Sequence, residues 1–143
     1  MKSTKTKKPV ALKTATIKQK AFVSATPAEV YDVFLDAKKH SKFTGGKATI
    51  ARRVGGKFTA HDGYISGKNL KLESGRRIVQ EWSTTDWAKG YKPSWIEFKF
   101  VSKKGGTEIH MTQKNVPAKQ AASFKRGWID FYWKPLKKYF WEK

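Results

Sequence analysis

Few side chains in this sequence could bind a metal ion or transfer a proton. It contains three histidines and no cysteine, which leaves imidazoles and carboxylates as the available metal ligands. His40, His61 and His110 fall in different predicted elements, and only His61 has an adjacent carboxylate, that of Asp62. Neighbouring residues of a strand point to opposite faces, which disfavours a shared ligand geometry unless a turn reorients one of them. We therefore predict no metal site and no cofactor, and interpret His61 as a solvated hairpin residue.

Paired carboxylates and phosphate-binding loops give no stronger signal. Asp32 and Asp36 are four residues apart on a predicted helix, a spacing that places both on one face. Lys38 and Lys39 follow at once, which is typical of a solvated helix face rather than of a catalytic acid and base. The Gly-Gly pairs lack the Lys-Ser/Thr of a phosphate loop, and no Gly-x-Ser-x-Gly elbow occurs. We therefore predict a binding protein rather than an enzyme.

The net charge is the most unusual global property. The 143 residues carry 31 Lys and Arg against 11 Asp and Glu, a formal net charge of +20. A field of this sign attracts acidic proteins, nucleic acid and anionic lipid, but it says little about the fold. Two interpretations remain open, a well-solvated Lys-rich surface and a dedicated polyanion site. We expect nucleic acid to bind only weakly and without sequence specificity.

The chain divides into a tail and one domain. Residues 1–13 are rich in Lys and Thr, and we predict that they form a disordered basic tail before a folded domain at 14–143. No apolar run approaches the ~20 residues of a membrane span, and the first residues lack the apolar stretch of a secretory signal. We therefore expect a monomeric, cytoplasmic protein.

Apolar spacing divides the domain into short elements. Alternation over residues 16–23 predicts a strand, and Thr26 followed by Pro27 and Glu29 predicts a capped helix start. A second short helix is expected before Gly45. The period of two then returns in five runs between glycine-containing turns, which predicts an antiparallel meander with one buried face. These runs are residues 57–61, 64–73, 76–82, 95–101 and 107–116.

After Pro117 the apolar period changes to 3.6, which predicts a long C-terminal helix. Its apolar arc covers roughly 200°, well beyond the roughly 100° that one flat surface needs, so a curved surface must hold it. Pro135 within this helix predicts a bend. One strand, two short helices, a curved antiparallel sheet of about six to seven strands and a long gripped helix form the α+β helix-grip, or START-like, fold.

The ordered set of motifs resembles the activator of heat-shock-protein-90 ATPase homologue family, within the START-like, birch-pollen-allergen-like (SRPBCC) superfamily. The motifs are VGGKFTAHDGYISG at 54–67, RIVQEW at 77–82, WAKG at 87–90, GTEI at 106–109, NVP at 115–117, and Gly127-Trp128 with residues 133–139. The resemblance covers about Thr14 to Trp141. It implies a non-catalytic chaperone cofactor or stress-related regulator, whose partner is a heat-shock-protein-90-type chaperone or another acidic protein.

The sequence also departs from the pattern that this family commonly shows. Ser83 follows Trp82 where the family commonly has Arg, and Tyr91 follows Gly90 where it commonly has His, so partner contacts through those basic groups are in doubt. Eukaryotic co-chaperones of the family also carry a separate N-terminal chaperone-binding domain, and we expect this chain to act without one. The superfamily includes cyclases, but the residues here favour binding.

A helix gripped by a curved sheet leaves a groove between the two, lined by the large apolar residues of the inward-facing sets. The predicted lining residues are Phe34, Trp82, Phe98, Phe100, Met111, Trp128, Phe131 and Tyr132. Two interpretations remain open, because large aromatics at helical spacing often simply fill a core. The alternative is a pocket that binds a small apolar ligand or a lipid.

The loop at 83–93 combines aromatic and basic residues, which is unusual for a surface connection. Trp87 and Tyr91 alternate there with Lys89 and Lys92, and we take these four as candidate partner-binding residues. If the rings are exposed, they form a patch suited to a protein partner or to base stacking. The alternative is that Trp87 folds back over the open end of the groove.

Overall fold

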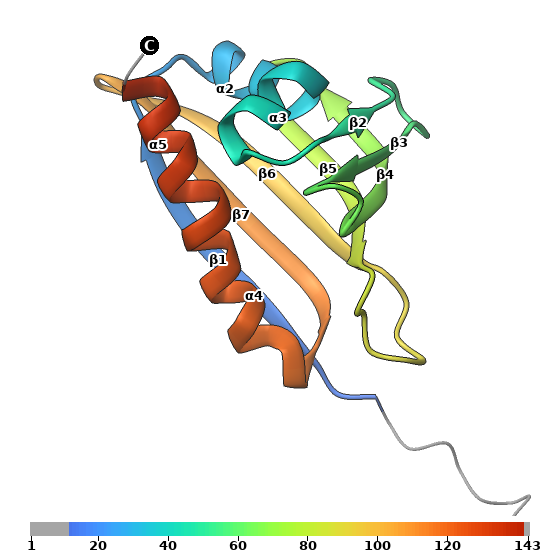
Figure 1. Cartoon of the computed structure of the whole chain (residues 1–143). Helices are drawn as coiled ribbons and strands as arrows, with labels where there is room; N and C mark the ends of the chain where they lie inside the picture. Colours follow the sequence, from blue (N-terminus) through green and yellow to red (C-terminus); the bar gives the residue numbers. More distant parts are fainter. Residues whose placement is uncertain (1–11, 142–143) are drawn as a thin grey trace, which may run out of the picture.

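Seven antiparallel strands form one curved sheet, and the C-terminal helices lie along its inner face (Figure 1). The computed structural model describes residues 12–141. Strand β1 (Thr14–Val23) lies at one edge, and the order across the sheet is β1-β7-β6-β5-β4-β3-β2. This arrangement confirms the helix-grip fold expected from the sequence.

The alternation that predicted the strands also distributes their side chains between two faces. In β6, Ile96, Phe98 and Phe100 are buried against the helices, whereas Lys99 and Val101 face outward. The remaining strands are β2 (Thr49–Ile50), β3 (Lys57–Ala60), β4 (Ile65–Glu73), β5 (Arg77–Thr84), β6 (Ser94–Lys103) and β7 (Gly106–Pro117). Every neighbouring pair is antiparallel, as the meander predicted.

Two short helices close one end of the sheet, α2 (Pro27–Leu35) and α3 (Ala37–Thr44). The predicted capping box is present: Thr26 Oγ1 accepts from the Glu29 N–H at 3.2 Å, and Glu29 Oε1 accepts from the Thr26 N–H at 2.9 Å. Asp32 forms ion pairs with Lys39 and Arg52, at 2.5 and 2.6 Å. Hydrogen bonds from these two cations hold the pKa of the Asp32 carboxyl below its usual range.

The C-terminal helix is continuous but changes its hydrogen-bond pattern partway along (Figure 1). A 3₁₀ turn, η1 (Ala118–Gln120), precedes α4 (Ala121–Trp128), a π-helical turn, η2 (Ile129–Trp133), and α5 (Lys134–Trp141). The π turn ends two residues before Pro135, so the hydrogen-bond pattern of the helix changes close to the proline at which a bend was expected.

The backbone of Lys13, which was predicted to belong to the tail, is bound to the folded domain. The carbonyl of Lys13 accepts hydrogen bonds from the Tyr91 hydroxyl at 2.9 Å and from the Ala118 N–H at 3.0 Å. Lys13 is thus part of the folded domain although its side chain is exposed. Residues 1–11, which make up the rest of the predicted tail, lie outside the described residues.

Buried polar groups connect the C-terminal helix to the sheet. Trp128 is 3% exposed, and its indole Nε1–H donates to Gln113 Oε1 at 2.9 Å. Gln113 Nε2 donates in turn to Ser94 Oγ at 3.0 Å, and Ser94 donates to the carbonyl of Trp82 at 2.7 Å. A buried indole N–H needs such an acceptor. The chain of bonds therefore fixes where α4 sits on β5, β6 and β7.

Trp128→Ala should lower the free energy of unfolding by about 3–5 kcal/mol, because it removes a large ring from a packed core. Trp128→Phe retains a ring but leaves Gln113 Oε1 without its donor, which should cost about 1–3 kcal/mol. Combining Trp128→Phe with Gln113→Leu removes both partners, so the double variant should lose less than the sum of the single losses. Urea unfolding of the four proteins measures these values, and strict additivity would contradict the proposed coupling.

Candidate functional site

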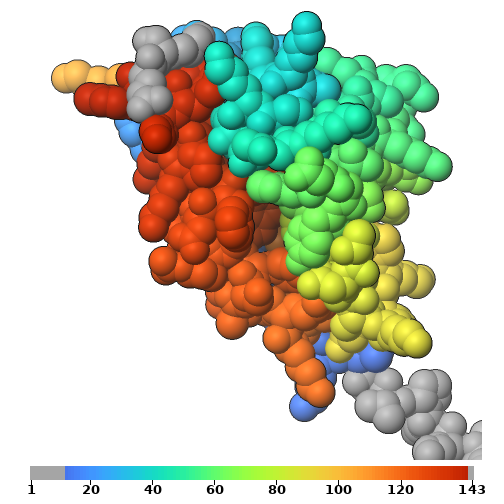
Figure 2. Space-filling model, viewed as in Figure 1, coloured from blue at the N-terminus to red at the C-terminus, as the bar shows by residue number. Residues whose placement is uncertain are grey.

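A cleft of about 450 Å³ lies between the turn joining β3 to β4 and the C-terminal helix. Figure 2 shows that the viewed face is hollowed where the green surface of that turn meets the orange surface of the helix. The residues that form its walls are largely aromatic. They include Tyr64, Trp82, Phe124, Trp128, Phe131 and Tyr132.

The space behind these walls is filled. Phe34, Phe98, Phe100 and Met111, four of the predicted groove residues, are buried core residues, and the Phe34 and Phe98 rings lie 4.7 Å apart. A void beside Phe34 and Phe98 has a volume of about 20 Å³, which is roughly the space of one water molecule. The sequence left open a filled core and a ligand pocket. The inner part of the predicted groove is a filled core.

The other four predicted groove residues border the cleft. Trp82, Trp128 and Tyr132 are buried, and each presents one side to it. Phe131 was expected to face inward, but it is 60% exposed and lies at the rim. Phe131 therefore borders the cleft as a groove residue, but it does not face inward, because the α-helical spacing assumed for it does not hold within the π turn.

His61 also lines the cleft, contrary to its interpretation as a solvated hairpin residue. Its ring lies 5.4 Å from that of Tyr132 and 6.0 Å from that of Phe131. His61 and Asp62 have φ values of 50° and 59°, so the turn rotates the imidazole toward the helix. Burial lowers the pKa of His61, while the neighbouring Asp62 carboxylate opposes that shift. In the sequence, the turn residues Asp62 and Gly63 were the signal that could have indicated this reorientation of His61.

The imidazole of His61 has no hydrogen-bond partner among residues 12–141, and its Nε2 atom is buried. Buried polar atoms without partners are rare in folded proteins. Asp62, by contrast, holds the turn, because its Oδ1 accepts from the Lys47 N–H at 2.9 Å. The cleft therefore offers one unused hydrogen-bonding group.

A second histidine lies behind the cleft wall. His40 Nδ1 is 3.1 Å from the carbonyl of Phe34, and because a carbonyl only accepts, this nitrogen must carry the hydrogen. Nε2 of His40 is then left to accept from the Tyr132 hydroxyl at 3.0 Å. Burial lowers the pKa of His40 to about 4 and raises that of Tyr132 well above its ordinary value. Both side chains are therefore neutral near pH 7.

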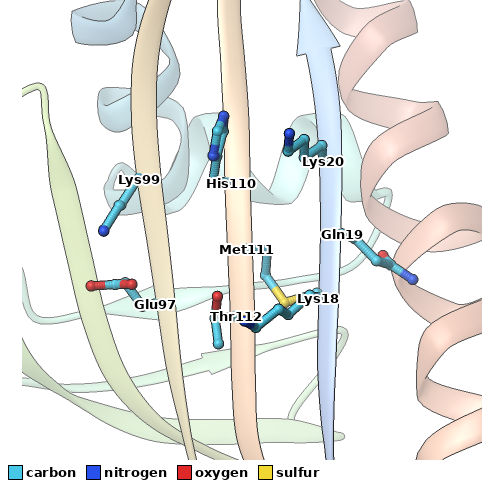
Figure 3. A pocket seen from close by; sticks show the side chains of 8 residues that line it. All are labelled: Lys18, Gln19, Lys20, Glu97, Lys99, His110, Met111 and Thr112. Atoms are coloured by element: carbon cyan, nitrogen blue, oxygen red, sulfur yellow. The ribbon is translucent and has the colours of Figure 1, made fainter.

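A different kind of site lies on the outer face of the sheet, where a hollow of about 360 Å³ is lined by residues of β1, β7 and β6. Lys20, His110 and Lys99 are consecutive partners across the three strands. Figure 3 shows Lys18, Glu97 and Thr112 beside this row. Alternation along each strand turns Gln19 and Met111 to the other side.

The loop between β5 and β6 extends beyond the end of the sheet (Figure 1), but its two aromatic side chains are held within the domain. Trp87 packs 5.5 Å from Phe124 and 6.1 Å from Trp82, and its Nε1–H donates to the carbonyl of Lys92 at 3.0 Å. Trp87 therefore folds back over the end of the core, as the second interpretation of this loop expected. The Tyr91 hydroxyl is bound to the Lys13 carbonyl. Of the four partner-binding candidates, Lys89 and Lys92 are exposed and the two rings are half-buried.

Residues 12–141 contain neither a cluster of metal ligands nor a membrane-spanning helix. No three His, Cys, Asp or Glu side chains lie close enough together there to hold a metal ion. No helix in that part of the chain is long and apolar enough to cross a membrane.

The model of one protein family, described as "Activator of Hsp90 ATPase homolog 1-like protein", matches residues 24–141. The "Activator of 90 kDa heat shock protein ATPase homolog" of Dictyostelium discoideum is 35% identical over 127 residues, which is 88% of this chain and 32% of that protein. The human "Activator of 90 kDa heat shock protein ATPase homolog 1" is 32% identical over 136 residues, 93% of this chain and 40% of that protein. This chain thus spans about a third to two fifths of these relatives' length.

Solved structures are similar in fold. An HSP90 activator from Plasmodium falciparum superimposes with a TM-score of 0.74 at 25% identity, covering 82% of this chain and 89% of that one. A protein from Mesorhizobium loti gives a TM-score of 0.76 at 16% identity, covering 90% of this chain and 98% of that one. The second similarity bears on the fold alone.

Stability should fall as the pH is lowered below the ordinary histidine pKa, because His40 is harder to protonate in the folded state than in the unfolded chain. The unfolded state binds more protons between pH 6.5 and about 4, so the stabilisation is complete above this range and is lost through it. From pH 7.5 to pH 5.0 the loss attributable to His40 should be about 2 kcal/mol.

Urea unfolding at both pH values measures this loss. His40→Gln cannot titrate, so this variant should lose the His40 part of the pH dependence although it is less stable throughout. Burial also lowers the pKa of His61, so the variant keeps the part of the pH dependence that belongs to His61. Asp32, Asp86 and Glu108 have lowered pKa values, so their contributions are lost mainly at pH values below this range. Equal pH dependence in the wild type and in His40→Gln would contradict the assignment to His40.

Proposed function

This chain belongs to the family of activator of Hsp90 ATPase homolog 1-like proteins, and from that membership we propose that it is a cofactor or regulator of a heat-shock-protein-90-type chaperone. The observation that carries the proposal is the match over residues 24–141, which covers nearly all of the helix-grip domain. The relatives are named as activators of another protein's ATPase. We propose the same kind of role here, in which the domain binds the chaperone and does not itself catalyse a reaction.

Charge is the property of this chain that most restricts its partner. At a net charge of +20, the domain is attracted to an acidic protein surface and repelled by a basic one. Contacts between exposed charges are weakened by salt, because the Debye length falls to about 8 Å at physiological ionic strength. We therefore propose an association of modest affinity that weakens as salt is added.

The outer-face hollow is the surface that we assign to this contact. Lys18, Lys20 and Lys99 line it from strands β1 and β6. No carboxylate lies within ion-pair distance of these three lysines in the described part of the chain, so their charges remain available to a partner. A row of such side chains on a rigid sheet loses less conformational freedom on binding than the same charges on a mobile segment.

The loop candidates make a smaller contribution in this proposal. Trp87 and Tyr91 already pack or hydrogen-bond within the domain. Only Lys89 and Lys92 project freely from that loop. We therefore assign the loop a supporting role, in which its two lysines add to the positive field.

The proposal predicts that the protein raises ATP turnover of the heat-shock-protein-90-type chaperone of its own organism. Calorimetry should detect binding at about 25 mM salt and a clear loss of affinity at about 150 mM salt. A variant with Lys18→Glu, Lys20→Glu and Lys99→Glu should lose at least tenfold in affinity, because it reverses the charge of the assigned surface.

The matched control carries Lys38→Glu, Lys42→Glu and Lys47→Glu, exposed lysines near α3 on another part of the surface. Its net charge equals that of the outer-face variant, so it should retain most of the binding. Equal losses in the two variants would show that only the overall charge matters and would overturn the assigned surface. Absence of binding at low salt would overturn the chaperone role itself.

A further inference from the structure

One end of the domain carries exposed aromatic rings together with exposed lysines, and neither the cleft nor the outer-face hollow includes them. The β6–β7 turn, the end of β1 and the last turn of α5 meet there (Figure 1). We propose that this end docks on the surface of a membrane that contains anionic phospholipids. The residues concerned, which we call the aromatic-basic end, are Phe22, Lys103, Lys104, Lys137, Lys138 and Trp141.

Trp141 and Phe22 are exposed although both side chains are large and apolar. Trp141 is 80% exposed and Phe22 is 42% exposed. Both border an open hollow of about 420 Å³, so they belong to one surface although they are far apart in sequence. Tryptophans usually bury most of their area, and the other five in this chain are buried or half-buried. Trp141 is therefore the indole that remains free for an external contact.

Two lysines share the exposed side of α5 with Trp141. Lys137 and Lys138 precede Trp141 by four and three residues, spacings that place side chains next to one another on a helix. Both lysines also border the hollow. The other side of this helix is buried through Leu136 and Phe140. The helix therefore presents Lys137, Lys138 and Trp141 to solvent in a fixed orientation.

The β6–β7 turn brings two more lysines to the same end. Lys103 is the last residue of β6, and Lys104 lies in the turn. The ring of Phe22 lies against this turn, because a Cβ atom at Gly106 would come within 2.9 Å of its Cζ atom. Figure 2 shows the light-orange surface of the turn projecting from the molecule beside the red surface of α5. A strand, a turn and a helix thus bring exposed side chains to one extremity of the domain.

The positive charge of this end is available to an anionic surface. None of its four lysines lies within ion-pair distance of a carboxylate in the part of the chain that the structure describes. The carboxylate opposite Phe22 is that of Glu108, which accepts from His110 at 2.7 Å and also interacts electrostatically with Lys103 and Lys20. No Asp or Glu is among the described residues that line the hollow. An approaching phosphate group therefore meets an excess of positive charge.

This combination of side chains suits the interface of a bilayer. An indole at the level of the lipid headgroups removes apolar area from water while its N–H still finds a hydrogen-bond acceptor. Lysines beside it reach the phosphates and the anionic headgroups through their long stems. Because the side chains stand at one extremity and come from three segments, they can meet a plane at the same time. Successive nucleic acid bases instead stack on rings that line a groove.

The two kinds of contact must act together to give useful binding. Lysines alone are attracted to an anionic membrane, but salt weakens that attraction. A few inserted side chains alone give only marginal, reversible binding. The combination predicts reversible docking that requires anionic lipid and places Trp141 in the interface. This docking uses none of the lysines of the outer-face hollow, so it does not depend on the proposed chaperone role.

The first experiment measures binding to vesicles by sedimentation. At about 100 mM salt the wild type should bind vesicles of phosphatidylcholine with about 30% phosphatidylserine, and at least tenfold more weakly vesicles of phosphatidylcholine alone. Lys137→Glu combined with Lys138→Glu should weaken binding to the anionic vesicles at least tenfold, because it reverses two charges at the contact. Both positions are exposed, so the variant should fold, and a thermal melt establishes that it does.

The matched control is Lys38→Glu combined with Lys42→Glu, which makes the same change of net charge on the exposed surface of α3. It should retain most of the vesicle binding. Residues 1–11 are the same in every variant, so their lysines cannot cause a difference between them. Equal losses in the two variants, or no binding of the wild type to the anionic vesicles, would overturn the proposal.

The second experiment follows the insertion of Trp141 by fluorescence. Anionic vesicles with brominated acyl chains should shift tryptophan emission to shorter wavelengths and quench it. Trp141→Ser should lose most of this response, and it should fold because the side chain is exposed. Phe131→Ser removes another exposed ring, at the rim of the cleft, and should keep the response. Unchanged emission from wild-type protein bound to vesicles would contradict insertion.

The same variants separate a membrane from other partners. The Lys137 and Lys138 variant should keep most of its affinity for the chaperone, because that contact is assigned to the outer-face hollow. Loss of chaperone binding in this variant, with no vesicle binding by the wild type, would show that the end contacts a protein. Tighter binding of a single-stranded oligonucleotide than of vesicles, with quenching of Trp141, would show a nucleic acid contact. Either result would overturn membrane docking.

Discussion

Two tryptophans on the C-terminal helix each need an acceptor for a buried indole N–H, and the hydrogen-bond pattern of the helix changes between them. Trp128 donates to Gln113 of β7, and Trp133 donates to Gln19 of β1 at 2.6 Å. Five residues of an α-helix turn through about 500°, so the two rings would lie about 140° apart on an unbroken helix. The π turn between them reduces this angle, and the rings stack 5.6 Å apart over the sheet.

The π turn explains the position of the cleft. Holding both tryptophans against the sheet turns Phe131, which lies between them in sequence, outward to 60% exposure. Tyr132 remains inside, where its hydroxyl donates to the neutral His40. The helix therefore presents one aromatic ring to solvent and one to the core within two residues. The β3–β4 turn lies opposite Phe131 and Tyr132 and contributes His61 to the cleft.

The sequence predicted those parts of the fold that depend on regular periods. Alternation located the strands, and the Thr26 to Glu29 spacing located the start of α2, because both follow from local geometry. Phe131 and His61 were misplaced because each lies where the period changes. An α-helical wheel places Phe131 with the buried stripe, and strict alternation does not describe a turn with two positive φ values. The change of period in the helix cannot be seen without knowing which tertiary contacts impose it, whereas the turn before Gly63 left a signal in the sequence.

Alternation along the strands places the lysines of the outer-face hollow and the core side chains on opposite faces of the sheet. Gln19 and Met111 face the helix, whereas their neighbours Lys18, Lys20 and His110 face outward from the same strands. The outer lysines contribute charge without contacting the aromatic walls, and the cleft contains none of the outer cations. Reversing the outer charges therefore leaves the packing of Trp128 and Trp133 unchanged. The outer lysines and the aromatic walls of the cleft therefore share no side chain.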